Sequence, residues 1–212
     1  MMFRDRREAG ERLASRLVSY RGRDPLILAV PRGGIVVADP IHDALGGELD
    51  LIITRKIGAP HQHELAIGAT GGDGFLMLNE TLISRIGISP DYIEEAAGRE
   101  RAEIKRRLAL YRGKRPVPFI ENQLVILVDD GVATGYTLLA ALRSIVKQNP
   151  AELVLAVPVG PPETLEELNK EVDALIYLEA PVNFAAVGQF YKDFSQVEDR
   201  EVIAILQDAW QK

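Results

Sequence analysis

The chain has 212 residues, 47% of them apolar, which is enough to bury one substantial core and argues for a single domain over residues 1–212. A net charge of −6 speaks against non-specific nucleic-acid binding, and the absence of cysteine excludes disulfides and thiolate zinc sites. The N-terminal segment MMFRDRREAG lacks a signal-peptide pattern, and the apolar runs are strand-sized, so we expect a cytoplasmic protein without a membrane span.

Residues 5–19 form the first predicted element, an amphipathic helix whose apolar positions would cover a sheet. A buried strand, Leu26 to Val30, follows; it ends in Pro31-Arg32-Gly33-Gly34 and leads into a helical pattern. An arginine binds phosphate oxygens in a bidentate fork, and two glycines beside it permit unusual backbone geometry. The turn is therefore a candidate anion site, and the alternative is an arginine in a solvated turn.

The next predicted strand, Leu49 to Thr54, ends in two adjacent cations, Arg55 and Lys56. A lysine ammonium is a flexible point charge that can follow a leaving group while negative charge develops on it. A pair of solvated surface cations is the alternative interpretation.

Residues 59–120 break the alternation of strands and helices and predict an inserted flap. Residues 64–70 and 75–78 are expected to pair as a hairpin across a glycine-rich turn. Ser89-Pro90 then marks the start of a long charged helix that reaches about Tyr111.

The segment from His61 to Glu64 also contains His63, so it could be read as a set of metal ligands. Side chains two positions apart share a face only in a strand, and no third group of ligands is evident. A solvated loop tip is the preferred interpretation, with a histidine that faces the substrate as a smaller alternative.

The sequence LVILVDDGVATGYT, Leu124 to Thr137, carries the strongest chemical signal. Its apolar run predicts a strand buried on both faces, which places Asp129 and Asp130 at the carboxyl end of that strand. The residues from Thr134 onward lie at a helix start, where free backbone N–H groups and the helix dipole bind an anion. Carboxylates repel phosphate but suit the hydroxyl groups of a sugar. The combination predicts a ribose phosphate site.

Two other interpretations of this segment compete with a ribose phosphate site. One is an ordinary strand, turn and helix in which Asp130 caps the helix. The other is a mononucleotide P-loop, which needs a Lys-Ser/Thr pair after its second glycine; because Tyr136 and Thr137 follow Gly135, that loop is absent.

The last third of the chain predicts a strand over 153–159, a helix through Leu165 and Leu168, a strand over 174–178 and a terminal helix from about Asp199 to Trp210. Segment 180–196 holds four aromatic residues in a chain that is only 6% aromatic. The alternation predicts an α/β fold with a mostly parallel central sheet flanked by helices. Ligands of such sheets bind at the carboxyl ends of the strands, so the three polar turns should converge.

The segment VILVDDGVATGYT resembles the phosphoribosyl-pyrophosphate (PRPP) motif of the type I phosphoribosyltransferases. The resemblance covers most of the chain and is best over 24–58 and 120–160. The whole chain is similar to a group of uncharacterised proteins of this kind, marked by F-x-DR, PRGG, RK-x-G-x-P, EL-AIGA, LVDDG-ATG and WY-x-DF-x-Q segments. Phe190 stands where the last pattern has tryptophan, which keeps a flat ring.

The resemblance implies a role for each matching residue. Asp129 and Asp130 would hold the ribose hydroxyls and assist the water shell of a magnesium ion, and Arg32 and Lys56 would act on the leaving group. Segment 180–198 would form a hood over the acceptor, with stacking on Phe184, Phe190 and Tyr191 or, as an equal alternative, packing of these rings against the core. The 5′-phosphate would lie on Gly131, Val132, Ala133, Thr134, Gly135, Tyr136 and Thr137, and pyrophosphate on Arg32, Gly33, Gly34, Arg55 and Lys56.

The resemblance therefore predicts an enzyme that uses PRPP and Mg²⁺ to transfer phosphoribose to a nitrogenous, purine-like base, with a flap that closes over the substrate. A homodimer is a possible assembly. The alternative is a non-catalytic regulator that senses PRPP or a nucleotide, since fold does not fix function. A hydrolase with Asp129 and Asp130 as metal ligands would need more carboxylates than this strand end offers.

Overall fold

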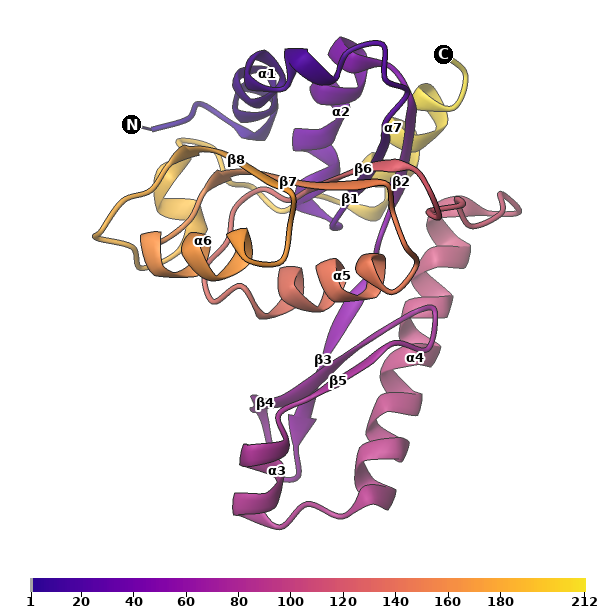
Figure 1. Ribbon diagram of the computed structural model, residues 1–212, viewed down its shortest axis with the longest axis vertical. Coiled ribbons are helices and arrows are strands. Elements are labelled where there is room, and N and C mark those ends of the chain that lie inside the picture. Colours follow the sequence, from indigo (N-terminus) through magenta and orange to yellow (C-terminus); the bar gives the residue numbers. More distant parts are fainter. Residues whose placement is uncertain (1) are drawn as a thin grey trace.

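The computed structural model describes residues 2–212, apart from the side chains of His63 and Glu64. Its centre is a five-stranded parallel sheet with the strand order β2-β1-β6-β7-β8, so the predicted parallel sheet is confirmed (Figure 1). The strands are β1 Leu26–Ala29, β2 Glu48–Leu51, β6 Leu124–Val128, β7 Glu152–Val159 and β8 Ala174–Glu179.

Helices cover both faces of this sheet (Figure 1). One face is covered by α1 Arg6–Arg16, α2 Gly33–Leu45 and α7 Asp199–Ala209, and the other by α5 Tyr136–Val146 and α6 Pro162–Asn169. Because both faces are covered, the inner strands β1, β6 and β7 are apolar at consecutive positions and not at alternating ones; β6 is buried throughout.

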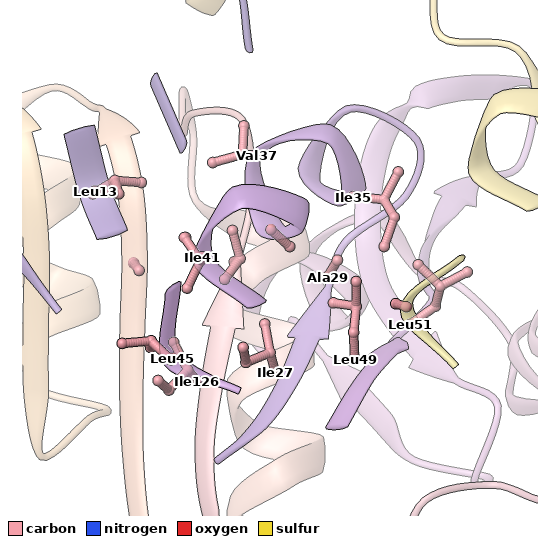
Figure 2. Packing of buried hydrophobic residues seen from close by; sticks show 14 of the residues in the cluster. Leu13, Ile27, Ala29, Ile35, Val37, Ile41, Leu45, Leu49, Leu51 and Ile126 are labelled. Atoms are coloured by element: carbon pink, nitrogen blue, oxygen red, sulfur yellow. The ribbon is translucent and has the colours of Figure 1, made fainter. Parts of the chain in front are cut away.

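Alternate residues of β1, β6 and β7 enter two separate cores. Figure 2 shows the first, in which Ile27 and Ile126 of the sheet meet Leu13 of α1 and Ile41 of α2. The second core places Leu28 against residues of α5 and α6. The period-2 geometry of a strand therefore decides which helix each residue of β1 contacts.

A second, three-stranded antiparallel sheet projects from the first and is formed by β3 Thr54–Ala59, β4 Gln62–Gly71 and β5 Leu76–Leu78. The helices α3 Glu80–Ile86 and α4 Pro90–Arg112 pack on it (Figure 1). The predicted hairpin and long helix are confirmed, and Ser89 caps α4 by accepting a bond from Tyr92 N–H. Helix α3 was not predicted, although Asn79 as cap and Gly87 at its end are ordinary boundary signals.

One predicted strand was wrong in its extent. The strand expected over Leu49 to Thr54 is β2, which ends at Leu51, and the chain then enters β3 at Thr54. Ile52 and Ile53 continue the apolar run across the junction, so hydrophobicity alone could not show where the chain leaves the core sheet. The remaining segment, residues 180–198, contains turns and the short 3₁₀ helix η2 Val187–Phe190; a second, η1 Val18–Tyr20, follows α1. Among the described residues, none of the helices combines the length and the apolar composition that a membrane span requires.

Candidate active site

The strand order places two polar turns side by side. From β1 the chain proceeds to β2 on one side, and from β6 to β7 and β8 on the other, so the topological switch lies between β1 and β6. Val30 N–H donates to Val128 O over 2.9 Å, which fixes the relative height of the two turns. A ligand-binding crevice is expected at this position in an open α/β sheet.

The turn after β1 fits against the turn after β6 only because it contains glycine. A Cβ atom on Gly33 would lie 1.8 Å from Oδ2 of Asp130, and one on Gly34 would lie 2.9 Å from Val128 O. The peptide bond between Pro31 and Arg32 is cis. The predicted convergence of these two turns is therefore present as direct packing.

Asp129 and Asp130 form a pair of half-buried carboxylates at the end of β6. Oδ1 of Asp129 accepts a bond from Asp130 N–H over 2.8 Å. Burial, and then the negative charge of Asp130, raise the pKa of Asp129 well above its ordinary value. Burial also raises the pKa of Asp130, against the opposing effect of Arg6.

Arg6 and Tyr191 both form hydrogen bonds to Asp130. Neither contact was predicted from the sequence. Arg6 Nε donates to Asp130 Oδ2 over 2.6 Å, and Arg6 Nη1 donates to Ser195 O over 2.8 Å. The hydroxyl of Tyr191 donates to the backbone oxygen of Asp130 over 2.6 Å. Arg6 lies in the F-x-DR segment, and this pattern is the sequence signal that could have identified Arg6 as a site residue.

The turn between β6 and α5 has the geometry of an anion cradle. Gly131 has a φ of 151° and Gly135 a φ of 73°, backbone conformations that favour glycine. Within the described part of the chain, the N–H groups of Ala133, Thr134 and Gly135 donate no hydrogen bond, and α5 begins directly after them. The N-terminal end of a helix attracts negative charge, so the turn suits a phosphate.

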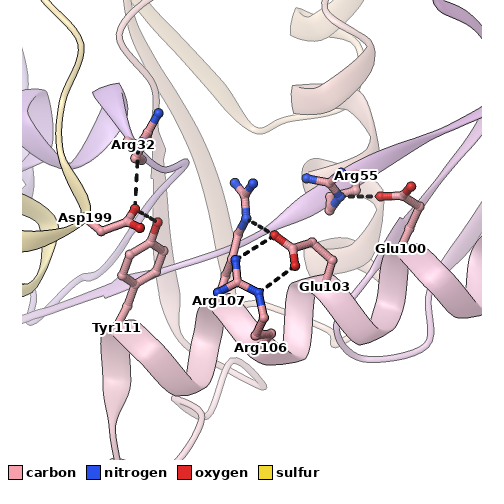
Figure 3. Close-up of polar contacts among 8 residues, drawn as sticks. All are labelled: Arg32, Arg55, Glu100, Glu103, Arg106, Arg107, Tyr111 and Asp199. Carbon is pink, nitrogen blue, oxygen red and sulfur yellow. Dashed lines mark hydrogen bonds and ion pairs between the residues drawn. The ribbon is translucent and has the colours of Figure 1, made fainter. Parts of the chain in front are cut away.

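Arg32 is the N-cap residue of α2 and reaches toward the C-terminal helix (Figure 3). Its Nη1 lies 3.7 Å from Oδ1 of Asp199, and the same oxygen accepts a bond from Tyr111 of α4 over 2.7 Å. Burial and the nearby Asp199 raise the pKa of Tyr111 to about 12. Arg32, in the turn after β1, is thus linked through Asp199 to α4, the long helix of the flap.

Arg55 and Lys56 were predicted to follow a strand of the core sheet. This placement was wrong, because both residues lie inside β3. Because successive strand residues point to opposite faces, the two cations are separated. Arg55 forms an ion pair with Glu100 of α4 (Figure 3), whereas Lys56 is exposed.

Helix α4 carries two further arginines that were not predicted as site residues. Arg106 and Arg107 each donate from Nε to Glu103 over 2.7 Å (Figure 3). These bonds lower the pKa of Glu103 to about 2. Arg32, Arg55, Arg106 and Arg107 therefore each have an acidic partner, which an incoming anion would have to displace.

The three aromatic residues predicted for acceptor binding lie in segment 180–198 but differ in exposure. Tyr191 is 5% exposed and packs on Phe3, with 5.2 Å between ring centroids. Phe184 and Phe190 are half-buried, and their centroids are also 5.2 Å apart. Acceptor binding stays a prediction for all three, and Phe184 and Phe190 are the more accessible.

The structure bears only in part on the segment from His61 to Glu64. His61 is exposed at the turn between β3 and β4, as expected for a loop tip. The side chains of His63 and Glu64 lie outside the described residues. Within the described part of the chain, no group of three His, Cys, Asp or Glu residues could hold a metal ion.

Comparisons with known proteins agree with this geometry. Residues 4–194 match the family model described as the phosphoribosyl transferase domain. Over 209 residues the chain is 36% identical to the candidate phosphoribosyl transferases MT0597 and Rv0571c of Mycobacterium tuberculosis strains CDC 1551 and H37Rv. The alignment covers 98% of this chain and 47% of each relative, so the chain spans about half the length of these proteins.

A solved structure is also similar over its whole length. The crystal structure of TT1426 from Thermus thermophilus has a TM-score of 0.85 and 43% sequence identity to the chain. The match covers 98% of this chain and 99% of that protein.

Proposed function

The chain belongs to the phosphoribosyl transferase family, and on this premise we propose that it transfers phosphoribose from PRPP to a nitrogenous, purine-like base and releases pyrophosphate. The observation that carries the proposal is the packing of Gly33 against Asp130. It brings the proposed pyrophosphate turn and the proposed ribose carboxylates together at the switch point of the sheet.

Each part of PRPP then has a chemically suited partner. The 5′-phosphate binds the free N–H groups of residues 133–135 at the start of α5. The ribose hydroxyls bind Asp129 and Asp130. Pyrophosphate binds Arg32, Gly33 and Gly34, with Arg55, Lys56, Arg106 and Arg107 as the nearby cations of the flap.

The donor set at Asp129 and Asp130 fits magnesium. Mg²⁺ prefers hard oxygen ligands and usually takes one or two carboxylates together with phosphate oxygens and water. Asp130 N–H donates a hydrogen bond to one oxygen of Asp129, and Arg6 donates one to an oxygen of Asp130. The other oxygen of each carboxylate is therefore available to bind the ion. When bound, the ion would neutralise charge on the pyrophosphate.

The residues of the chain act by positioning and by charge. Displacement of pyrophosphate from the ribose C1 passes through an oxocarbenium-like state, and no nucleophile from the protein is needed. Asp129 and Asp130 orient the ribose, while Arg32 and the flap cations stabilise the departing pyrophosphate. The flap excludes water, which would otherwise hydrolyse the sugar cation. Phe184 and Phe190 are the proposed acceptor contacts.

The test is a measurement of pyrophosphate release by purified protein with PRPP, Mg²⁺ and a panel of bases, together with calorimetric titration of PRPP. Base-dependent release would support the enzyme. Binding of PRPP without base-dependent release would overturn catalysis and favour the sensor, and unchanged PRPP affinity in Asp130→Asn would overturn the ribose contact. The cytoplasmic location and the homodimer stay predictions.

A further inference from the structure

A side chain of α6 contacts the turn between β6 and α5, the turn that we propose binds the 5′-phosphate. Thr164, in the first turn of α6, donates a hydrogen bond from Oγ1 to Ala133 O over 2.9 Å. The two residues are 31 positions apart in the chain. A residue outside the turn thus contacts the backbone of the turn directly.

This hydrogen bond fixes the direction of the N–H group of Thr134. The peptide bond between Ala133 and Thr134 is trans, and the C=O and N–H groups of a trans peptide point in opposite directions. Because Ala133 O points toward α6, Thr134 N–H points away from it, and it donates no hydrogen bond within the described part of the chain. A peptide rotated the other way would present Ala133 O instead, and a carbonyl oxygen repels phosphate.

The methyl group of Thr164 contacts the same turn at Gly135. Gly135 has a φ of 73°, and a Cβ atom on it would lie 2.9 Å from Cγ2 of Thr164. Threonine is branched at Cβ, which restricts rotation about χ1, so the positions of Oγ1 and Cγ2 are fixed together. Thr164 therefore contacts the residues on both sides of Thr134.

Helix α6 is a firm support for this contact. Leu165 is buried in the second core, directly after Thr164. Earlier in the turn, Val132 N–H donates to Val159 O at the end of β7 over 2.9 Å. The segment from β7 to α6 thus holds the turn at two points, and Thr164 supplies the contact at the residues whose N–H groups are free.

We propose that Thr164 is a positioning residue for the 5′-phosphate of PRPP. Its hydroxyl orients the peptide between Ala133 and Thr134 so that Thr134 N–H faces the phosphate at the start of α5. Thr164 acts through the backbone of the turn and does not itself touch the substrate. This role rests on the proposed function and deepens it, because it assigns the geometry of the phosphate site to a residue outside the turn.

Calorimetric titration of the whole chain with PRPP, ribose 5-phosphate and pyrophosphate tests the role. Thr164→Val keeps the branched shape and removes the hydroxyl, so it should weaken binding of PRPP and of ribose 5-phosphate about three- to tenfold, the scale of one hydrogen bond. Pyrophosphate affinity should stay unchanged, because its proposed site is the turn after β1. Thr164→Ser keeps the hydroxyl and should bind both sugar phosphates nearly as tightly as the wild type.

Thr81→Val is the matched control, because Thr81 is exposed in the first turn of α3 and loses the same hydroxyl; it should leave all three affinities unchanged. Three results would overturn the role of Thr164 and leave the proposed function intact: unchanged ribose 5-phosphate affinity in Thr164→Val, an equal loss for pyrophosphate, or an equal loss in Thr164→Ser. Absence of PRPP binding in the wild type would instead overturn the proposed function, and this role with it.

Discussion

Arg6 donates a hydrogen bond to Asp130 over 2.6 Å across a sequence separation of 124 residues. The same guanidinium lies 3.8 Å from the centroid of the Phe194 ring and donates to Ser195 O. Helix α1, the turn after β6 and the segment near the chain end therefore meet at one cation. This contact fixes the orientation of a carboxylate that we propose binds ribose.

Arg6→Gln should raise the KM for PRPP on the order of 100-fold, the scale of a small misplacement of a catalytic group. The pKa of Asp130, already raised by burial, should rise further because the opposing cation is lost. Activity should then fall at a higher pH on acidification than in the wild type. Kinetics as a function of pH measure both effects. Arg16→Gln, an exposed position on the same helix, is the control.

Gly33→Ala should abolish the close fit between the two turns, because the added Cβ would lie 1.8 Å from Asp130 Oδ2. We expect a loss in kcat/KM on the order of 100-fold with PRPP. Gly98→Ala is the control: its Cβ would meet nothing within 4 Å inside α4, so unfolding should cost up to about 1 kcal/mol more. Equal kcat/KM in the two variants would contradict the assigned role of Gly33.

Glu103→Gln should strengthen inhibition by pyrophosphate, because it removes the negative charge that pairs with Arg106 and Arg107. An effect of about two- to fivefold is expected for solvent-exposed ion pairs. Glu95→Gln, which releases Arg99 on the same helix, should leave pyrophosphate inhibition unchanged. A decrease in inhibition with Glu103→Gln would show that these arginines do not contact the leaving group.

Asp50→Asn should lower the free energy of unfolding by about 3–5 kcal/mol, because it leaves the buried Arg112 without its counter-ion. The double variant Asp50→Leu with Arg112→Met should recover most of that loss. Chemical denaturation of the single and double variants measures both.

The same residue makes stability depend on pH. Burial raises the folded-state pKa of Asp50 above the unfolded value of about 3.9, so the folded state binds the proton more tightly. Ionisation of Asp50 should therefore lower the free energy of unfolding as the pH rises between these two values. Comparison of the wild type with the double variant across that pH range isolates this contribution.

The strand ends could be predicted because local pattern determines them. Apolar runs followed by glycine, arginine or aspartate marked the ends of β1 and β6, and the structure places both turns where they were expected. The long helix of the flap was predicted from its cap, Ser89, and from Pro90. The end of β2 was predicted wrongly because Ile52 and Ile53 are apolar and would fit either a longer β2 or the connection to β3.

The partners of the site residues could not be predicted. Asp199 meets both Arg32 and Tyr111, and Glu100 meets Arg55, across long sequence separations that no local pattern records. Tyr191 looked equally suited to stacking and to packing, and its 5% exposure and its bond to Asp130 were decided by the way segment 180–198 folds back on Phe3, before the start of α1.

The sequence by itself determined the parallel sheet, the two turns at neighbouring strand ends and the family, because these depend on hydrophobic period and on residues adjacent in the chain. Only the tertiary structure decided which cation pairs with which carboxylate. Contacts such as Arg6 with Asp130 form only when distant segments pack, and their strength depends on the burial that packing creates.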